Sequence, residues 1–208
     1  GPVGPHSVPR NAQEDPLGAF KARIRQARFP FLSANITQRR PCVQPGESWV
    51  SPFAIVERQG VKIGVIGLTT PETPEATYRQ NVISLGFEPM LGALRRALAE
   101  TRKRGAAVTV VLAHAGVGVD ETTGRPMGPI AELARALRPG EVDLIISGHM
   151  HQPFSDFIHG TAVLQPWPHG TAFVRADLVV DPDSGTLAGR PRLYGNTFFL
   201  GSSLDGRP

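Results

Sequence analysis

Three of the six histidines stand where a chemical site would form. His114 comes just after the apolar run 107–112, and His149 and His151 follow the apolar run 142–146. Imidazole is a common nitrogen ligand for Zn²⁺ and similar ions, and histidines two apart can face one cavity when the loop is extended. We therefore expect His114, His149 and His151 to be metal ligands, with Gly148 letting the backbone approach closely. For His114 alone, a hydrogen-bonded histidine at a strand end is an equal alternative.

Other polar residues carry weaker signals. His6 lies in a polar opening segment, where we expect it to be exposed to solvent. His159 precedes a strand, so a local role is expected, and His169 in Trp-Pro-His-Gly is interpreted as a turn histidine. Asn35 is expected to orient a loop through side-chain hydrogen bonds rather than to take part in catalysis.

The elements that must position the three ligands follow from the spacing of apolar residues. Helical spacing predicts helices at 15–27, 90–104 and 129–137. Apolar runs predict strands at 31–36, 53–57, 62–68, 107–112, 142–146, 161–165, 171–180 and 187–194, with loops at 37–51 and 69–78. The runs after 160 are interpreted as antiparallel strands. The repeated strand–helix–strand order predicts an α/β fold, in which ligand sites form at the carboxyl ends of the strands.

Composition narrows the class of protein. A chain of 208 residues with 40% apolar residues can bury one core, and its net charge is +4. Because the basic residues are scattered over separate segments, no nucleic-acid partner is indicated. Cys42 is the only cysteine, which excludes an intrachain disulfide and a thiolate metal cluster. No run approaches the roughly 20 apolar residues of a membrane span, no signal sequence opens the chain, and residues 1–15 are interpreted as a loop.

Four segments carry a resemblance to a known family. They read FPFLSANI, GVKIGVIGLTTPETP, VVLAHAG and DLIISGHMHQPF, and they lie between Phe29 and Asp181. They resemble successive blocks of the calcineurin-like metallophosphoesterases, in particular the bacterial 5′-nucleotidases. The resemblance implies a metallophosphoesterase-type αββα sandwich with mixed sheets and helices outside. Residues 1–194 would supply the C-terminal half of that catalytic domain, and 195–208 an exit segment or linker.

The resemblance also implies a chemistry. Two divalent metal ions, Zn, Mn or Fe, would act on a nucleotide or another phosphate ester and hydrolyse phosphate monoesters. His114 and His149 would bind one ion and His151 the other. The 2′,3′-cyclic-nucleotide phosphodiesterases, which share these blocks, and a noncatalytic metal-binding module are the alternatives. Export to the periplasm or the cell exterior is implied as well.

Three motifs of the resembled family do not occur in this sequence. They are Asp-x-His, Gly-Asp and Gly-Asn-His-Glu, which would supply the bridging carboxylate and the catalytic histidine. The catalytic and substrate-binding residues therefore stay unassigned. We expect these 208 residues to be a fragment that by itself holds at most one weakly bound ion and has no activity.

Overall fold

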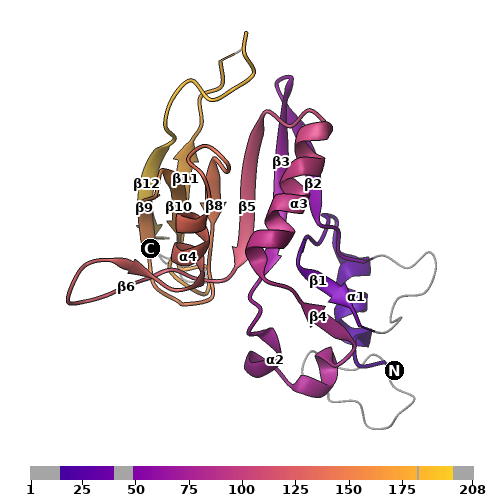
Figure 1. Ribbon diagram of the computed structural model, residues 1–208. Coiled ribbons are helices and arrows are strands. Elements are labelled where there is room, and N and C mark those ends of the chain that lie inside the picture. Colours follow the sequence, from indigo (N-terminus) through magenta and orange to yellow (C-terminus); the bar gives the residue numbers. More distant parts are fainter. Residues whose placement is uncertain (1–14, 40–48, 182, 199–208) are drawn as a thin grey trace, which may run out of the picture. The chain divides into compact units, whose positions relative to one another are not determined.

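The computed structural model describes residues 15–39, 49–181 and 183–198 (Figure 1). The chain divides into two compact units, residues 1–112 and 113–208, and each is described by itself. The loop expected at 1–15 lies almost wholly outside the described residues, as do His6 and Cys42.

The first unit is built on a β-hairpin. Strands β2 (Phe53–Arg58) and β3 (Val61–Thr69) pair antiparallel, and Gln59 and Gly60 form the turn with φ angles of 50° and 79°. Two positive φ values are typical of a type I′ turn, whose twist suits a two-residue hairpin. The first residues of β5 (Val108–His114) continue this sheet beside β3. The predicted hairpin is confirmed.

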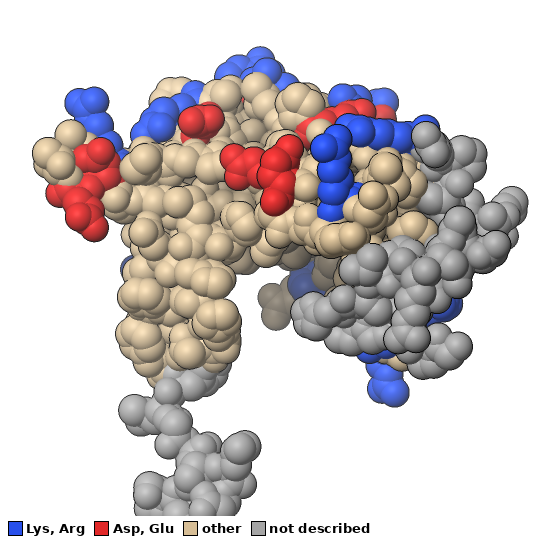
Figure 2. Space-filling view, turned by 90° about the horizontal axis from the view of Figure 1, so that it is seen from below, with Lys and Arg blue, Asp and Glu red and all other residues tan. Residues whose placement is uncertain are grey.

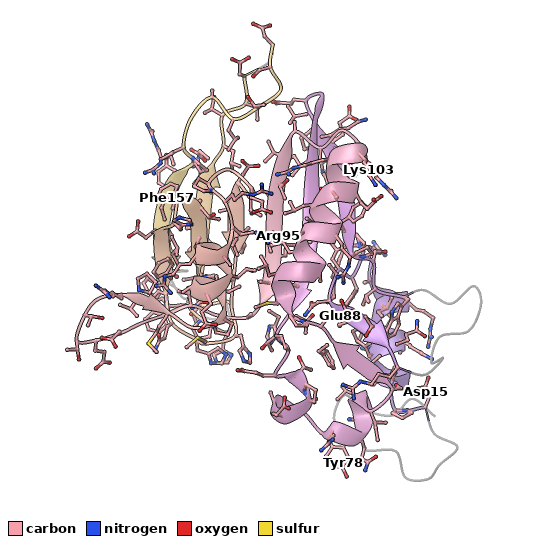
Figure 3. The ribbon with its side chains drawn as sticks, in the orientation of Figure 1. Asp15, Tyr78, Glu88, Arg95, Lys103 and Phe157 are labelled. Atoms are coloured by element: carbon pink, nitrogen blue, oxygen red, sulfur yellow. The ribbon has the colours of Figure 1, made fainter. Side chains whose placement is uncertain are left out.

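Helix α3 (Met90–Lys103) packs along β2 and β3 (Figure 1). Its buried residues repeat at helical spacing, as the sequence predicts: Met90, Ala93, Leu94, Ala97, Leu98 and Thr101. Figure 3 labels Glu88 just before this helix, Arg95 within it and Lys103 at its end. Basic residues in the last turn complement the helix dipole.

The rest of the first unit consists of short elements. They are α1 (Gly18–Gln26), β1 (Ile36–Gln38), α2 (Thr73–Ala76), a 3₁₀ turn at Arg79–Val82, and β4 (Leu85–Phe87), which pairs with β1. The predicted strand 31–36 is wrong, because only a bridge from Leu32 to Ser51 precedes β1. There the Ser33 N–H donates to Ser51 and the Ala34 N–H to Gly67, so no regular ladder forms. The predicted loop 69–78 contains α2.

The second unit begins with the last two residues of β5. Its core sheet has the order β8 (Leu144–Ile146), β10 (Thr161–Gln165), β9 (Phe154–Ile158). Strand β10 is buried throughout and runs parallel to β8 and antiparallel to β9. The antiparallel arrangement predicted for 161–165 is confirmed on the side of β9, a strand that the sequence did not indicate. It is wrong on the side of β8, which β10 joins in parallel.

Five further elements complete the second unit. Helix α4 (Pro129–Ala136) contacts β9 and the short β7 (Pro126–Met127), which pairs with β6 (Gly118–Val119). Strands β11 (Ala172–Asp177) and β12 (Arg192–Phe198) are antiparallel, as predicted. Since β12 runs on to Phe198, residues 195–198 belong to a strand, and 199–208 lie outside the described residues. The domain boundary at 194 stays a prediction. Arg190, just before β12, lies over the ring of Phe157 in β9.

The surface agrees with the scattered charges of the sequence. On the face that Figure 2 shows, Lys and Arg form separate groups among acidic and uncharged residues rather than one stripe. None of the helices in the described ranges has the length and apolar character that crossing a membrane requires.

Candidate metal centre

The structure brings two of the three predicted ligands into direct contact within the second unit. His114 is the last residue of β5, and His149 lies three residues beyond β8. His149 Nδ1 is 3.2 Å from His114 Nε2, and the ring centroids are 4.8 Å apart. The expectation that these two strand ends converge is met.

The 3.2 Å separation has two chemical interpretations. An N–H of one imidazole can donate to the bare nitrogen of the other. Two nitrogens that bind one tetrahedral Zn²⁺, each at about 2.0–2.1 Å, lie about 3.3 Å apart, so the same arrangement also suits a shared ion. Burial, and then the charges of His149 and His151, lower the pKa of His114 from its ordinary value. His114 is thus mainly neutral at pH 7, which is the form that binds metal.

His151 pairs with a histidine that sequence reasoning set aside. Its ring centroid is 4.8 Å from that of His169, at an interplanar angle of 69°. All four histidines are exposed, so the candidate site lies at the surface of the second unit. Among residues 15–39, 49–181 and 183–198, no three or more His, Cys, Asp and Glu side chains form one metal-binding group. The described residues therefore offer two imidazole pairs rather than one closed ligand set.

The loop after β8 has an unusual backbone. His149 has a φ of 76°, and the Met150 N–H donates to the Gly148 carbonyl over 2.9 Å. A hydrogen bond between residues i and i+2 around a positive φ defines a γ-turn of the rare, strained kind. His151 also has a positive φ of 56°. Such strain at a non-glycine residue persists only where the surrounding structure holds the residue in place. It is common at functional sites.

Met150 anchors this loop between the two histidines. Its side chain packs over Gly116, where an added Cβ would lie 2.3 Å from Met150 Cγ and 2.7 Å from the Gly148 oxygen. Gly118 and Gly128 also adjoin Met150. By contrast, a Cβ on Gly148 would meet nothing within 4 Å. The expectation that Gly148 provides the close approach is therefore wrong, and Gly116 fills that role.

Gln165, at the end of β10, connects the loops that carry the histidines. Its amide is fully buried: Oε1 accepts from the Val117 N–H over 3.0 Å, and Nε2 donates to the Val117 carbonyl over 2.8 Å. Oε1 also accepts from Ser147 Oγ, and Nε2 donates to the Gln152 carbonyl. In addition, the Gly148 N–H donates to the Ala115 carbonyl. These bonds fix the ends of β5 and β8 to each other.

Asn35 has a comparable role in the first unit. It is fully buried; its Nδ2 donates to the carbonyls of Thr69 and Glu88, and its Oδ1 accepts from the Thr69 N–H. The expectation that Asn35 orients loops is confirmed. Nearby, a Cβ on Gly67 would lie 2.1 Å from the Leu32 oxygen, which explains the glycine in the Gly-Val-Ile-Gly-Leu segment.

Known proteins resemble the chain in both sequence and structure. A 5′-nucleotidase of Vibrio cholerae is 27% identical over 184 residues, which cover 79% of this chain and 32% of that protein. The solved 5′-nucleotidase precursor of Thermus thermophilus superposes with a TM-score of 0.66 at 26% identity, over 86% of this chain and 36% of that one. The chain is thus similar to 5′-nucleotidases in both sequence and structure. No family model matches it.

The fold of the chain is that of the metallophosphoesterases. The calcineurin-like phosphoesterase YfkN of Bacillus subtilis superposes with a TM-score of 0.68, over 87% of this chain and 59% of that one, at 22% identity. The predicted α/β metallophosphoesterase class is confirmed. The chain spans about a third of the length of the curated relatives that it matches: 31% of Protein UshA from Yersinia enterocolitica and 32% of the Vibrio cholerae protein.

The donor chemistry of the four histidines fits half of a divalent metal site. Each imidazole pair supplies two nitrogen ligands, whereas a tetrahedral ion takes four. Within the described ranges no carboxylate joins either pair in a ligand set. Completion of a site therefore requires donors beyond the four histidines, in line with the absence of the three carboxylate and histidine motifs from the sequence.

Proposed function

We propose that the complete protein containing this chain hydrolyses phosphate monoesters with the help of divalent metal ions, and that nucleoside monophosphates are its substrate class. The observation that carries the proposal is the contact of 3.2 Å between His114 and His149 at the ends of two strands. The similarity to 5′-nucleotidases supports the substrate class. Export from the cytoplasm belongs to the same proposal.

Within this proposal, the chain's contribution is to hold metal ions. His114 and His149 would bind one ion and His151 would bind another. Such ions would neutralise phosphate charge and lower the pKa of a bound water. The chain's own residues keep the imidazoles in place: Gln165 and Met150 fix the loops, and the lowered pKa of His114 keeps its ring free of a competing proton at neutral pH.

A noncatalytic metal-binding role is the second candidate for the 208 residues taken alone. It is favoured by the lack, in the described part of the chain, of a ligand group with three or more members. A 2′,3′-cyclic-nucleotide phosphodiesterase activity is the alternative for the complete protein.

The test is a phosphate-release assay on the complete protein, with AMP and 2′,3′-cyclic AMP as substrates in the presence of Mn²⁺ or Zn²⁺. We expect turnover of AMP that a chelator abolishes. His149→Ala should lower kcat by more than the roughly 10–100-fold that changes around a metal ligand cost. His159→Asn is the matched control, because the His159 ring contacts the Leu137 carbonyl away from the pairs. Near-normal activity of His149→Ala, or preference for the cyclic substrate, would contradict the proposal.

A further inference from the structure

The two imidazole pairs have nearly the same geometry. Ring centroids are 4.8 Å apart in both, and the interplanar angles are 65° for His114 and His149 and 69° for His151 and His169. In the first pair, this geometry places two nitrogens at a separation suited to one tetrahedral ion. The second pair, on the same unit, brings its two rings equally close and offers the same kind of nitrogen donor.

His169 is held toward His151 by a defined turn. His169 and Gly170 have φ angles of 61° and 68°, and the Thr171 N–H donates to the Pro168 carbonyl. Two positive φ values within an i to i+3 hydrogen bond define a type I′ turn. Thr171 Oγ1 donates to the same carbonyl over 2.8 Å.

The start of this loop is fixed as well. The Trp167 N–H donates to Asn196 Oδ1 over 2.7 Å, which ties the loop to β12. Gln165, two residues earlier, is held by its bonds to Val117, and Nε2 of its amide also reaches the Gln152 carbonyl beside His151. The same residue thus anchors the chain on both sides of the His151–His169 pair.

We infer that His169 is a metal ligand that acts together with His151, so that the second unit holds two divalent ions, one at each imidazole pair. This rests on the proposed metal-binding function of His114, His149 and His151. It assigns a fourth imidazole to the site and gives His151 a partner within this chain. It also departs from the expectation, made from the sequence, that these 208 residues alone hold at most one ion. Zn²⁺ and Co²⁺ suit such nitrogen donors.

The turn itself provides clean variants. Asn-Gly and Gly-Gly are preferred in type I′ turns, so His169→Asn and His169→Gly remove the imidazole and keep the backbone. His159→Asn is the matched control: His159 and Gly160 form the turn between β9 and β10, with φ angles of 50° and 85°. His159 and His169 each lie in a His-Gly turn. They differ in what the ring contacts, which is the Leu137 carbonyl for His159 and the His151 ring for His169.

The experiment is Zn²⁺ titration of the full chain by isothermal calorimetry, with imidazole nitrogen NMR shifts followed on the same samples. We expect two binding events in the unmodified chain. Both His169 variants should remove one event or weaken it by more than about tenfold, and should abolish the Zn²⁺-dependent shift of the His151 ring. His159→Asn should leave both events unchanged, and His149→Ala should remove the other event.

The outcomes separate this inference from the proposed function. Unchanged Zn²⁺ binding and an unchanged His151 shift in both His169 variants, with loss of binding in His149→Ala, would overturn the role of His169 alone. A single event in the unmodified chain that the His169 variants do not affect would also overturn it. Absence of any Zn²⁺ binding in the unmodified chain would overturn this inference, whereas AMP turnover by the complete protein that a chelator does not affect would overturn the proposed function.

Discussion

Met150 lies directly on Gly116 and leaves no room for a side chain at position 116. A Cβ there would meet Met150 Cβ and the Gly148 carbonyl oxygen at 2.7 Å each. Both atoms belong to the loop that carries His149 and His151. The backbone path between the two histidines therefore depends on the contact of Met150 with Gly116.

Gly116→Ala should displace this loop. Forcing a methyl group into a packed site costs about 1–3 kcal/mol of unfolding free energy, and here part of the obstacle is backbone, which cannot rotate away. Urea denaturation measures the loss, and Zn²⁺ affinity should fall as well. Gly148→Ala is the control, expected within about 0.5 kcal/mol because open space surrounds that position. Equal effects of the two changes would show that the Met150 contact does not hold the loop.

Gln165→Leu should lower the free energy of unfolding more than the similar size of the two side chains suggests. It leaves the Val117 N–H and carbonyl without their buried partner, at about 1–3 kcal/mol for each group. Thr161→Val is a control in the same strand. Thr161 Oγ1 is buried and has no hydrogen-bond partner among the described residues, so its removal should leave the free energy of unfolding unchanged or raise it. If the Gln165→Leu chain were as stable as the Thr161→Val chain, the hydrogen bonds of Gln165 would not be what fixes the strand ends.

Asn35→Ala should destabilise the first unit. Three backbone groups, the Thr69 N–H and the carbonyls of Thr69 and Glu88, lose their side-chain partner, and each loss costs about 1–3 kcal/mol before relaxation. Thermal unfolding measures the change. Asn81→Ala offers a comparison, because within the described ranges the buried Asn81 Oδ1 accepts no hydrogen bond. Similar melting temperatures for the two variants would argue against the role of Asn35.

The pH dependence of stability should carry a contribution from His114. Its pKa is lowered in the folded chain, chiefly by burial, from an ordinary value of 6.5. Below that value the unfolded chain binds more protons at this position, so the free energy of unfolding falls as the pH is lowered through and below 6.5. Above it, His114 contributes no slope.

The check is urea denaturation of the metal-free chain at about pH 7.5, 6.5 and 5.5. His114→Asn should lose less stability over this range than the unmodified chain does, because the neutral amide does not titrate. The same slope in both proteins would show that His114 protonates as readily in the folded chain as in the unfolded one.

Local patterns predicted much of the fold and of the site. The hairpin turn at Gln59 and Gly60, the apolar face of α3 and the histidines after two apolar strands each depend on neighbours in sequence. The Gly-His-x-His spacing was enough to select His149 and His151, and the approach of His114 followed from the rule that strand ends converge.

The missed residues depend on contacts between distant parts of the chain. Gln165 resembles the polar end of a strand, and its partner Val117 lies 48 residues away. His169 occupies a turn that any small polar residue could form, and only the position of the turn brings it to His151. The sequence alone does not distinguish Gly116 from Gly148. The position of the Met150 side chain shows that Gly116, and not Gly148, has no room for a Cβ.

The bonds of Gln165 also limit what protein engineering can transfer. A graft of the segment Ser147–Gln152 into another α/β scaffold would carry both histidines but not the amide that pairs with Val117 and reaches Ser147 and Gln152 from another strand. A transplanted site would need the end of β10 at the correct depth in the host sheet. The smallest portable unit is thus a pair of strands with their loops, and the histidine motif alone is not enough.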